Sequence, residues 1–113
     1  MCTRNQLDII TSTVAGSAKR LLNKNLISVI LYGSYARGDF DDESDIDIMI
    51  IADIPADECW NYNVQLINEL TDLELENGIV ISTHIVQAEI FNQFTNTLPF
   101  YPNVTREGIK IAV

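Results

Sequence analysis

The stretch LYGSYARGDFDDESDIDIMII, residues 31–51, places a glycine–serine pair after one apolar run and a cluster of acids before a second apolar run. Six of the nine residues from Asp39 to Asp47 are acidic. An ionised carboxylate is costly beside a hydrophobic core unless a cation or hydrogen bonds compensate it. The stretch therefore predicts two strands joined by a functional turn, with acids concentrated where the second strand enters the core.

The apolar runs on either side of this turn predict two neighbouring strands. Leu26–Tyr32 and Ser44–Ile51 are rich in β-branched residues, and we expect both to be buried strands. Eleven residues separate Gly33 from Asp45, which is barely enough for the crossover helix of a parallel pair. An antiparallel pair is the simpler geometry, and it places the end of the first strand beside the start of the second.

Two aspartates and a glycine–serine turn face each other in this arrangement. Asp45 and Asp47 stand two apart, so they project from the same face of a strand and can share a divalent cation, with Mg²⁺ the first choice. Gly33 and Ser34 begin a tight turn whose N–H groups and hydroxyl suit phosphate oxygens, and residues 36–37 continue it as one helical turn. The pattern predicts a site for a metal-bound polyphosphate.

Three other interpretations of the acidic turn compete with this one. A solvated turn is disfavoured because the Asp-x-Asp pair lies within an apolar run. A calcium-binding EF-hand loop starting at Asp39 would need Gly at position 44 and Glu at position 50, where Ser44 and Ile50 stand. A P-loop would need Gly-Lys-Ser/Thr after the glycine, and this is absent from the sequence.

Hydrophobic periodicity predicts the remaining elements. They are a helix over residues 3–22 with a Thr3/Gln6 capping box, a long helix from Pro55 to Asn77-Gly78, a strand over Ile79–Val86, a short helix over 88–97 broken by Pro99 and Pro102, and a last apolar segment, Ile109–Val113. In the long helix, the residues that recur on one face are Trp60, Val64, Ile67, Leu70 and Leu73. This order predicts a single domain over residues 1–113, an α/β (α+β) fold with a small mixed sheet covered by helices in two layers.

Composition limits the class of protein. Apolar residues make up 47% of the chain, the formal charge is −9 and the sequence pI is about 4.2. This charge argues against a dedicated nucleic-acid binder, and no apolar stretch approaches the roughly 18 residues of a membrane span. Without a signal-peptide pattern we expect a cytoplasmic protein, and Cys2 and Cys59 lack metal or redox spacing, so we expect free thiols.

The motif resembles that of a known family. Gly33-Ser34, ten residues, then Asp45-Ile46-Asp47, with Ala36-Arg37-Gly38 and Ser44 between them, resembles the nucleotidyltransferase superfamily that includes DNA polymerase beta. Within it, the resemblance is to the minimal nucleotidyltransferases of bacteria and archaea. Such enzymes transfer a nucleoside monophosphate from a nucleoside triphosphate, usually ATP, to a hydroxyl, with two metal ions clamping the attacking and leaving oxygens.

The resemblance implies roles for individual residues. Asp45 and Asp47 would ligate the metal ions. Gly33 and Ser34 would hold the β- and γ-phosphates. Arg37 would steady the turn or the triphosphate, with a salt bridge to the neighbouring acids as the alternative.

The family's third carboxylate, on the strand after the long helix, is missing from this sequence. The position that aligns with it is Gly78. Glu76 could reach in from two residues earlier, and it belongs to a run with Asp72 and Glu74 at a helix C-terminus, where the helix dipole disfavours acids. Glu76 is therefore the predicted third catalytic acid, with three solvated acids as the alternative.

Other side chains near the predicted site have two interpretations. Gly78, Val80, Ser82 and His84 would share one face of the third strand by alternation, and His84 would be either a base or nucleotide contact, or a hydrogen-bonded edge residue. The aromatic residues could stack on a base, although at these spacings most are expected in the core: Trp60, Tyr62, Phe91, Phe94, Phe100 and Tyr101.

The resemblance points to a partner protein as the acceptor. It predicts an Mg²⁺-dependent enzyme that moves AMP from ATP to a hydroxyl of a partner, acting as the antitoxin of a helical HEPN-class toxin. A domain that has lost catalysis and neutralises its partner by contact is the alternative, which the residue Gly78 favours. Modification of an antibiotic or other small molecule would need an additional helical domain, for which 113 residues leave no space.

Overall fold

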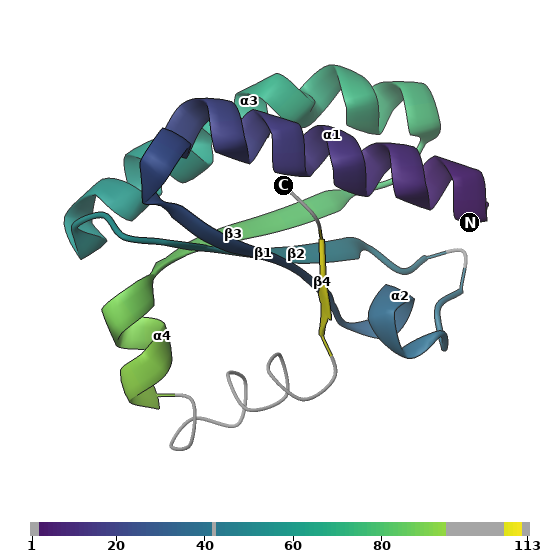
Figure 1. Cartoon of the computed structure of the whole chain (residues 1–113). Coiled ribbons are helices and arrows are strands. Elements are labelled where there is room, and N and C mark those ends of the chain that lie inside the picture. The colour runs from purple at the N-terminus through teal and green to yellow at the C-terminus, as the bar shows by residue number, and fades with distance from the viewer. Residues whose placement is uncertain (1–2, 42, 95–107, 112–113) are drawn as a thin grey trace.

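The computed structural model describes residues 3–41, 43–94 and 108–111, and its four strands form one mixed sheet (Figure 1). The strands are β1 (Leu26–Tyr32), β2 (Ile46–Ala52), β3 (Ile81–Gln87) and β4 (Ile109–Lys110), in the order β3-β2-β1-β4. The helices are α1 (Arg4–Leu22), α2 (Ser34–Arg37), α3 (Ala56–Asn77) and α4 (Ala88–Phe94), and a 3-10 turn covers Asn23–Asn25. The predicted fold class is confirmed.

Strand pairing places the two halves of the motif together. β1 pairs antiparallel with β2, as the short connection predicts, and Tyr32 is the register partner of Asp47. β3 runs parallel to β2, because α3 carries the chain back along the sheet between them. β1 also pairs antiparallel with β4. β3 and β4 are therefore the two edges of the sheet.

Helices α1 and α3 cover one face of the sheet and build the main core (Figure 1). The capping box predicted for α1 is present, with Thr3 Oγ1 accepting the Gln6 N–H and Gln6 Oε1 accepting the Thr3 N–H. The apolar spacing of α1 then buries Ile10, Val14 and Ala18 completely. From the sheet, alternate residues of β1, β2 and β3 meet them: Val29, Leu31, Ile46, Ile48, Ile50, Ile81 and Ile85.

A second, smaller apolar cluster lies on the other face of the sheet. It consists of Ile30, Met49, Ile51 and Phe91, the last from α4. Figure 1 shows α4 on the side of the sheet opposite α1 and α3. Because both faces of β2 are covered over most of its length, this strand reads as a continuous apolar run rather than an alternating one.

The face of α3 that packs on the sheet agrees with the predicted one at Leu70 and Leu73 but not at Trp60, Val64 and Ile67. The fully or nearly buried residues are Cys59, Leu66 and Leu70, whereas Trp60 is 71% exposed and Ile67 is 42% exposed. The core side also includes a polar contact, in which Thr83 Oγ1 donates to Asn63 Oδ1 at 3.1 Å. The prediction followed the largest apolar side chains and missed a packed face made with a cysteine and an asparagine.

The predicted boundaries shift by a few residues. Gly78 ends α3 in the left-handed conformation and the Ile79 N–H still bonds to the Glu74 carbonyl, so β3 starts at Ile81 rather than Ile79. Residues 95–97 of the predicted last helix lie outside the described residues, as do Pro99, Phe100, Tyr101, Pro102 and Cys2. Within the described residues, no helix combines the length and hydropathy that crossing a membrane requires.

Candidate active site

The glycine of the motif lies directly against one of the two aspartates. Gly33 follows β1 and precedes α2, with φ at +75°, in a region that side-chain-bearing residues rarely adopt. A Cβ at this position would lie 2.4 Å from Oδ2 of Asp47. Glycine is therefore required both by the backbone conformation and by the space that the Asp47 carboxylate occupies.

Asp45 and Asp47 flank the fully buried Ile46, so they project from the face of the sheet opposite α1 and α3. Asp45 is exposed and lies just before β2, while Asp47 is half-buried within it. α2 begins directly after Gly33, whose carbonyl accepts the N–H groups of Ala36 and Arg37, both at 3.1 Å. The predicted juxtaposition of the Gly33 turn with Asp47 is thus present.

Electrostatics at Asp47 favour a bound cation. Burial raises the pKa of this carboxyl above its usual value, and the charge of Asp45 raises it further. His84 and Arg37 act in the opposite direction and lower the pKa of Asp47. The carboxylates of Asp45 and Asp47 therefore interact unfavourably when both are ionised, which is the arrangement that a divalent cation relieves.

Local hydrogen bonds hold the acidic turn between α2 and β2. Asp41 Oδ1 accepts the Glu43 N–H at 2.9 Å, and Ser44 Oγ accepts the Asp41 N–H at 3.0 Å. Arg37 Nε donates to Asp39 Oδ2 at 3.1 Å, so the salt bridge predicted as the alternative role of Arg37 is present. These bonds fix the conformation of the loop immediately before Asp45. The Ser44 hydroxyl is part of this turn.

The neighbouring strands contribute three side chains beside Asp47. Tyr32 lies opposite Asp47 on β1, and both burial and the Asp47 charge raise its pKa well above the usual range. On β3, Ser82 is the register partner of Asp47, and its hydroxyl lies 3.4 Å from Nε2 of His84. The sequence reasoning missed Tyr32, although antiparallel pairing across a short turn was the signal that could have found it.

The other predicted site residues lie elsewhere. Gly78 is the C-cap of α3 and does not belong to β3, so it does not share the strand face of Ser82 and His84 as predicted. Glu76 is exposed in the last turn of α3. Among the residues that the structure describes, no group of three His, Cys, Asp or Glu side chains is arranged to hold a metal ion. Glu76 as third ligand stays a prediction.

The side chains at this site are of the chemical type that binds a magnesium ion. Two adjacent carboxylates offer the hard oxygen ligands that Mg²⁺ prefers, and its remaining positions are commonly taken by waters and substrate phosphates. The bare backbone at Gly33 leaves the Asp47 carboxylate room that any other residue would fill. Asp45 and Asp47 are therefore the residues that would hold the ion.

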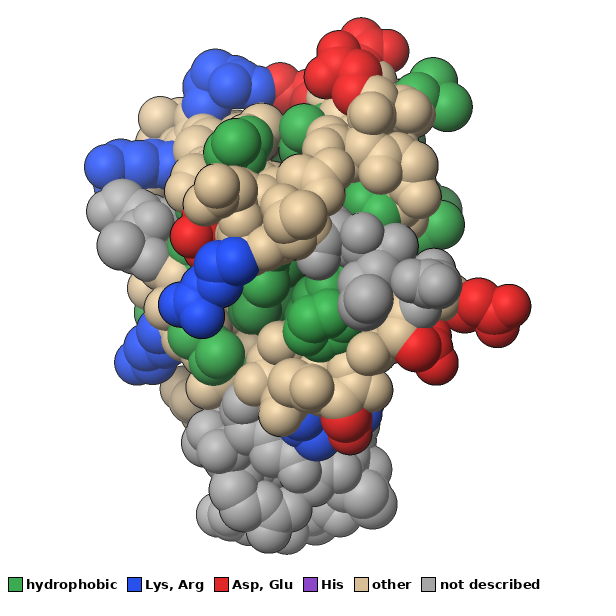
Figure 2. Space-filling model, turned by 90° about the vertical axis from the view of Figure 1, so that its right-hand side faces the viewer, with side chains coloured by type: hydrophobic (Ala, Val, Ile, Leu, Met, Phe, Trp, Pro, Cys, Tyr) green, Lys and Arg blue, Asp and Glu red, His purple; other side chains and the backbone are tan. Residues whose placement is uncertain are grey.

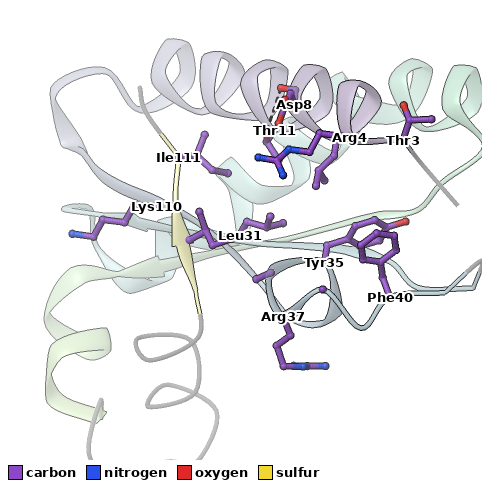
Figure 3. Close-up of a pocket in the computed structure, with 14 residues that line it drawn as sticks. Thr3, Arg4, Asp8, Thr11, Leu31, Tyr35, Arg37, Phe40, Lys110 and Ile111 are labelled. Carbon is purple, nitrogen blue, oxygen red and sulfur yellow. Dashed lines mark hydrogen bonds between the residues drawn. The ribbon is translucent and has the colours of Figure 1, made fainter.

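A separate cavity of about 550 Å³ lies between α1, α2 and β4 (Figure 3). Its lining includes Arg4 of α1 and the ring of Tyr35, which stacks on Phe40 with centroids 4.3 Å apart. Neither Asp45 nor Asp47 lines it. It is distinct from the site formed by the two aspartates, although Arg37 of α2 lines it.

Comparison with known proteins places this chain in a family. The family model described as Polymerase beta, Nucleotidyltransferase matches residues 17–108. Two relatives come from Methanocaldococcus jannaschii. Putative protein adenylyltransferase MJ0604 is 44% identical over 80 residues, covering 71% of this chain and 72% of the relative. Putative protein adenylyltransferase MJ0141 is 34% identical over 82 residues, covering 72% and 80%.

Solved structures share the fold. A structure assigned as a minimal nucleotidyltransferase aligns with a TM-score of 0.60 and 21% identity, covering 95% of this chain and 94% of that one. A chain from the crystal structure of a toxin–antitoxin with AMP-PNP aligns with a TM-score of 0.50 and 20% identity, covering 94% and 71%. From the family match and the two relatives, the chain belongs to the Polymerase beta nucleotidyltransferase family and is a nucleotidyltransferase.

Proposed function

We propose that this protein transfers AMP from ATP to a hydroxyl of a partner protein, with Mg²⁺ held by Asp45 and Asp47, and that it is the antitoxin of a HEPN-class toxin. The observation that carries the proposal is the packing of the Gly33 turn against the Asp47 carboxylate, with Asp45 beside it. Both Methanocaldococcus relatives are named as protein adenylyltransferases, which supports a protein as the acceptor.

The reaction exchanges a phosphoanhydride bond of ATP for a phosphodiester bond to the acceptor. The acceptor oxygen forms a bond to the α-phosphorus of ATP, the bond from that phosphorus to the bridging oxygen breaks, and pyrophosphate leaves. Bound magnesium supplies charge neutralisation for the phosphate oxygens. The turn at Gly33 and Ser34 orients the outer phosphates, and the protein's contribution is chiefly positioning and electrostatics.

The acceptor hydroxyl must lose a proton in this reaction. Two side chains are candidates to accept it. His84 faces the site from β3 and is close enough to affect the pKa of Asp47, while Glu76 is the predicted third carboxylate. The variants His84→Gln and Glu76→Gln separate these two candidates. Only the substitution that removes the true base should lower the transfer rate, by about 10²-fold or more. Unchanged rates in both variants would assign the proton to solvent.

Labelled nucleotide tests the proposal directly. The protein is incubated with magnesium, the purified product of the adjacent gene, and ATP labelled at either the α- or the γ-phosphate. AMP transfer predicts label on the partner from α-labelled ATP only. Asp47→Asn should lower this labelling by about 10²-fold or more, since even outer-shell changes at metal sites cost 10- to 100-fold. Asp53→Asn, at the opposite end of β2, is the matched control and should leave labelling unchanged.

The lack of a third metal ligand among the described residues favours a second function. In the described part of the chain, no third acid or histidine completes a metal group with Asp45 and Asp47. A domain that neutralises its partner by contact would form the complex but leave it unlabelled. A stable complex without label from α-labelled ATP therefore supports this second function and overturns the first.

A further inference from the structure

An exposed apolar stripe runs along α3. We call Trp60, Val64, Ile67 and Leu75 the α3 stripe, and these side chains are between 36% and 76% exposed. Their spacing of three to eight residues keeps them on one side of the helix, away from the buried side chains of Cys59, Leu66 and Leu70. Large apolar side chains aligned on an otherwise polar surface mark interaction sites more often than single ones do.

The stripe lies beside the free edge of the sheet. Asn63 bonds to Thr83 of β3, while Glu69, on another side of α3, forms a salt bridge to Arg20 of α1. By helical periodicity, Ile67 lies one turn from Asn63, on the β3 side of the helix. β3 is paired only with β2 among the described strands, so the stripe borders an edge that a partner can reach.

The apolar surface continues from the stripe along the end of α3 to the residues just before β3. A shallow depression of about 400 Å³ is lined by Leu75, Ile79 and Val80 together with residues of the last turns of α3. Val80 is 54% exposed, and its carbonyl accepts the N–H of Ile46 at 2.9 Å. Ile46 stands between Asp45 and Asp47, so this surface ends beside the strand that carries the two aspartates.

The charge around this surface has one sign. Residues 38–105 contain no Lys or Arg but hold fourteen of the sixteen acidic residues of the chain. In the fold this segment supplies β2, α3, β3 and α4, whereas the described basic residues come from α1, α2, β4 and the turn after α1. Figure 2 shows this separation on one face, with basic side chains mainly on the left and acidic ones mainly at the top and right.

We propose that the α3 stripe and the β3 edge form the docking surface for the acceptor protein, and that the acceptor binds with an apolar patch bordered by lysine and arginine. This inference rests on the function proposed above. Charge complementarity selects this occupant, because six acids and no base lie on α3. A second copy bound stripe to stripe would bring these acids together, and each copy carries a net charge of −9.

Binding measurements with a matched pair of variants test the docking surface. Trp60→Ser and Ile67→Ser remove the stripe at exposed positions, and Ile9→Ser removes an isoleucine that is 61% exposed on α1. The probe is the purified product of the adjacent gene, titrated calorimetrically. The stripe variants should weaken binding about tenfold or more, and Ile9→Ser should not change it. Asp72→Lys, which reverses a charge on the exposed face of α3, should also weaken binding.

The outcomes separate docking from chemistry. Asp47→Asn should bind the probe as the wild type does and fail only in transfer. The docking surface is overturned if the stripe variants bind the probe as tightly as the wild type does, or if the wild type does not bind the probe. It is also overturned if sedimentation shows a dimer of this chain that the stripe variants convert to a monomer. Stripe-dependent binding without label transfer would keep the docking surface and overturn the proposed enzymatic function.

Discussion

At Gly33, a single missing side chain determines whether the two halves of the site can meet. Gly33→Ala places a methyl group against Asp47 Oδ2. It also requires an alanine to adopt the φ of +75° that glycine has at this position. We expect a loss of about 1–3 kcal/mol in the free energy of unfolding, measured by urea denaturation, together with loss of AMP transfer.

A second glycine provides the control for this variant. Gly16 lies inside α1 with nothing within 4 Å of a Cβ built on it. Gly16→Ala should raise the free energy of unfolding by about 0.5–1 kcal/mol, because alanine favours the helix. If Gly33→Ala were as stable and as active as Gly16→Ala, the close packing against Asp47 would be irrelevant to the site.

Asp47 makes stability depend on pH. Its pKa in the folded protein is raised, first by burial and then by Asp45, so the folded state binds this proton more tightly than the unfolded state does. The wild type therefore loses stability as the pH rises from the ordinary aspartate pKa through the raised folded pKa. Asp47→Asn does not titrate, so its stability advantage should grow over this range and then level off, at about 1 kcal/mol or less because solvent screens a half-buried group.

Denaturation in the presence of a chelator checks the pH dependence. The difference between Asp47→Asn and wild type is measured below the ordinary aspartate pKa and again at neutral pH. Asp53→Asn, an exposed aspartate just after the same strand, serves as the charge-matched control. A difference in stability that is constant across this pH range would show that burial and the charge of Asp45 do not raise the pKa of Asp47.

At the scale of elements, one acid joins the end of α3 to β3. The Glu74 carboxylate accepts the N–H of Ile81, the first residue of β3, at 3.0 Å. Glu74→Ala should lower the free energy of unfolding by about 1–2 kcal/mol, since a hydrogen bond to a charged group is lost. Glu76→Ala, two residues later and exposed, should stay within about 0.5 kcal/mol of wild type. Equal effects in urea denaturation would contradict the link.

For the whole molecule, the separated charges predict a response to salt. Residues 38–105 carry fourteen acids without a base, so their mutual repulsion opposes folding at low ionic strength. Potassium chloride should raise the melting temperature by a few degrees as the Debye length falls to about 8 Å near physiological strength. Sucrose at equal osmolality controls for excluded-solute effects and should give a smaller rise. A melting temperature that falls with potassium chloride would contradict the repulsion.

Local signals in the sequence were sufficient for much of the fold. Thr3 and Gln6 mark the start of α1, Gly78 marks the end of α3, and the short connection after Gly33 predicts the antiparallel pair. Each signal depends on residues close together in the chain, whose geometry is set by backbone conformation and nearby hydrogen bonds. The same locality made the Gly-Ser and Asp-x-Asp halves of the site recognisable.

Only the tertiary structure decided which surfaces meet. The sequence by itself determined the motif, the elements and the excess of acids, because these follow from residue type and short spacing. It did not determine that α3 packs through Cys59 and Leu66 and leaves Trp60 exposed, or that Tyr32 and Ser82 lie opposite Asp47. Those outcomes depend on the fit between elements far apart in the chain, and that fit is settled when a complete core is packed rather than by the periodicity of any one helix or strand.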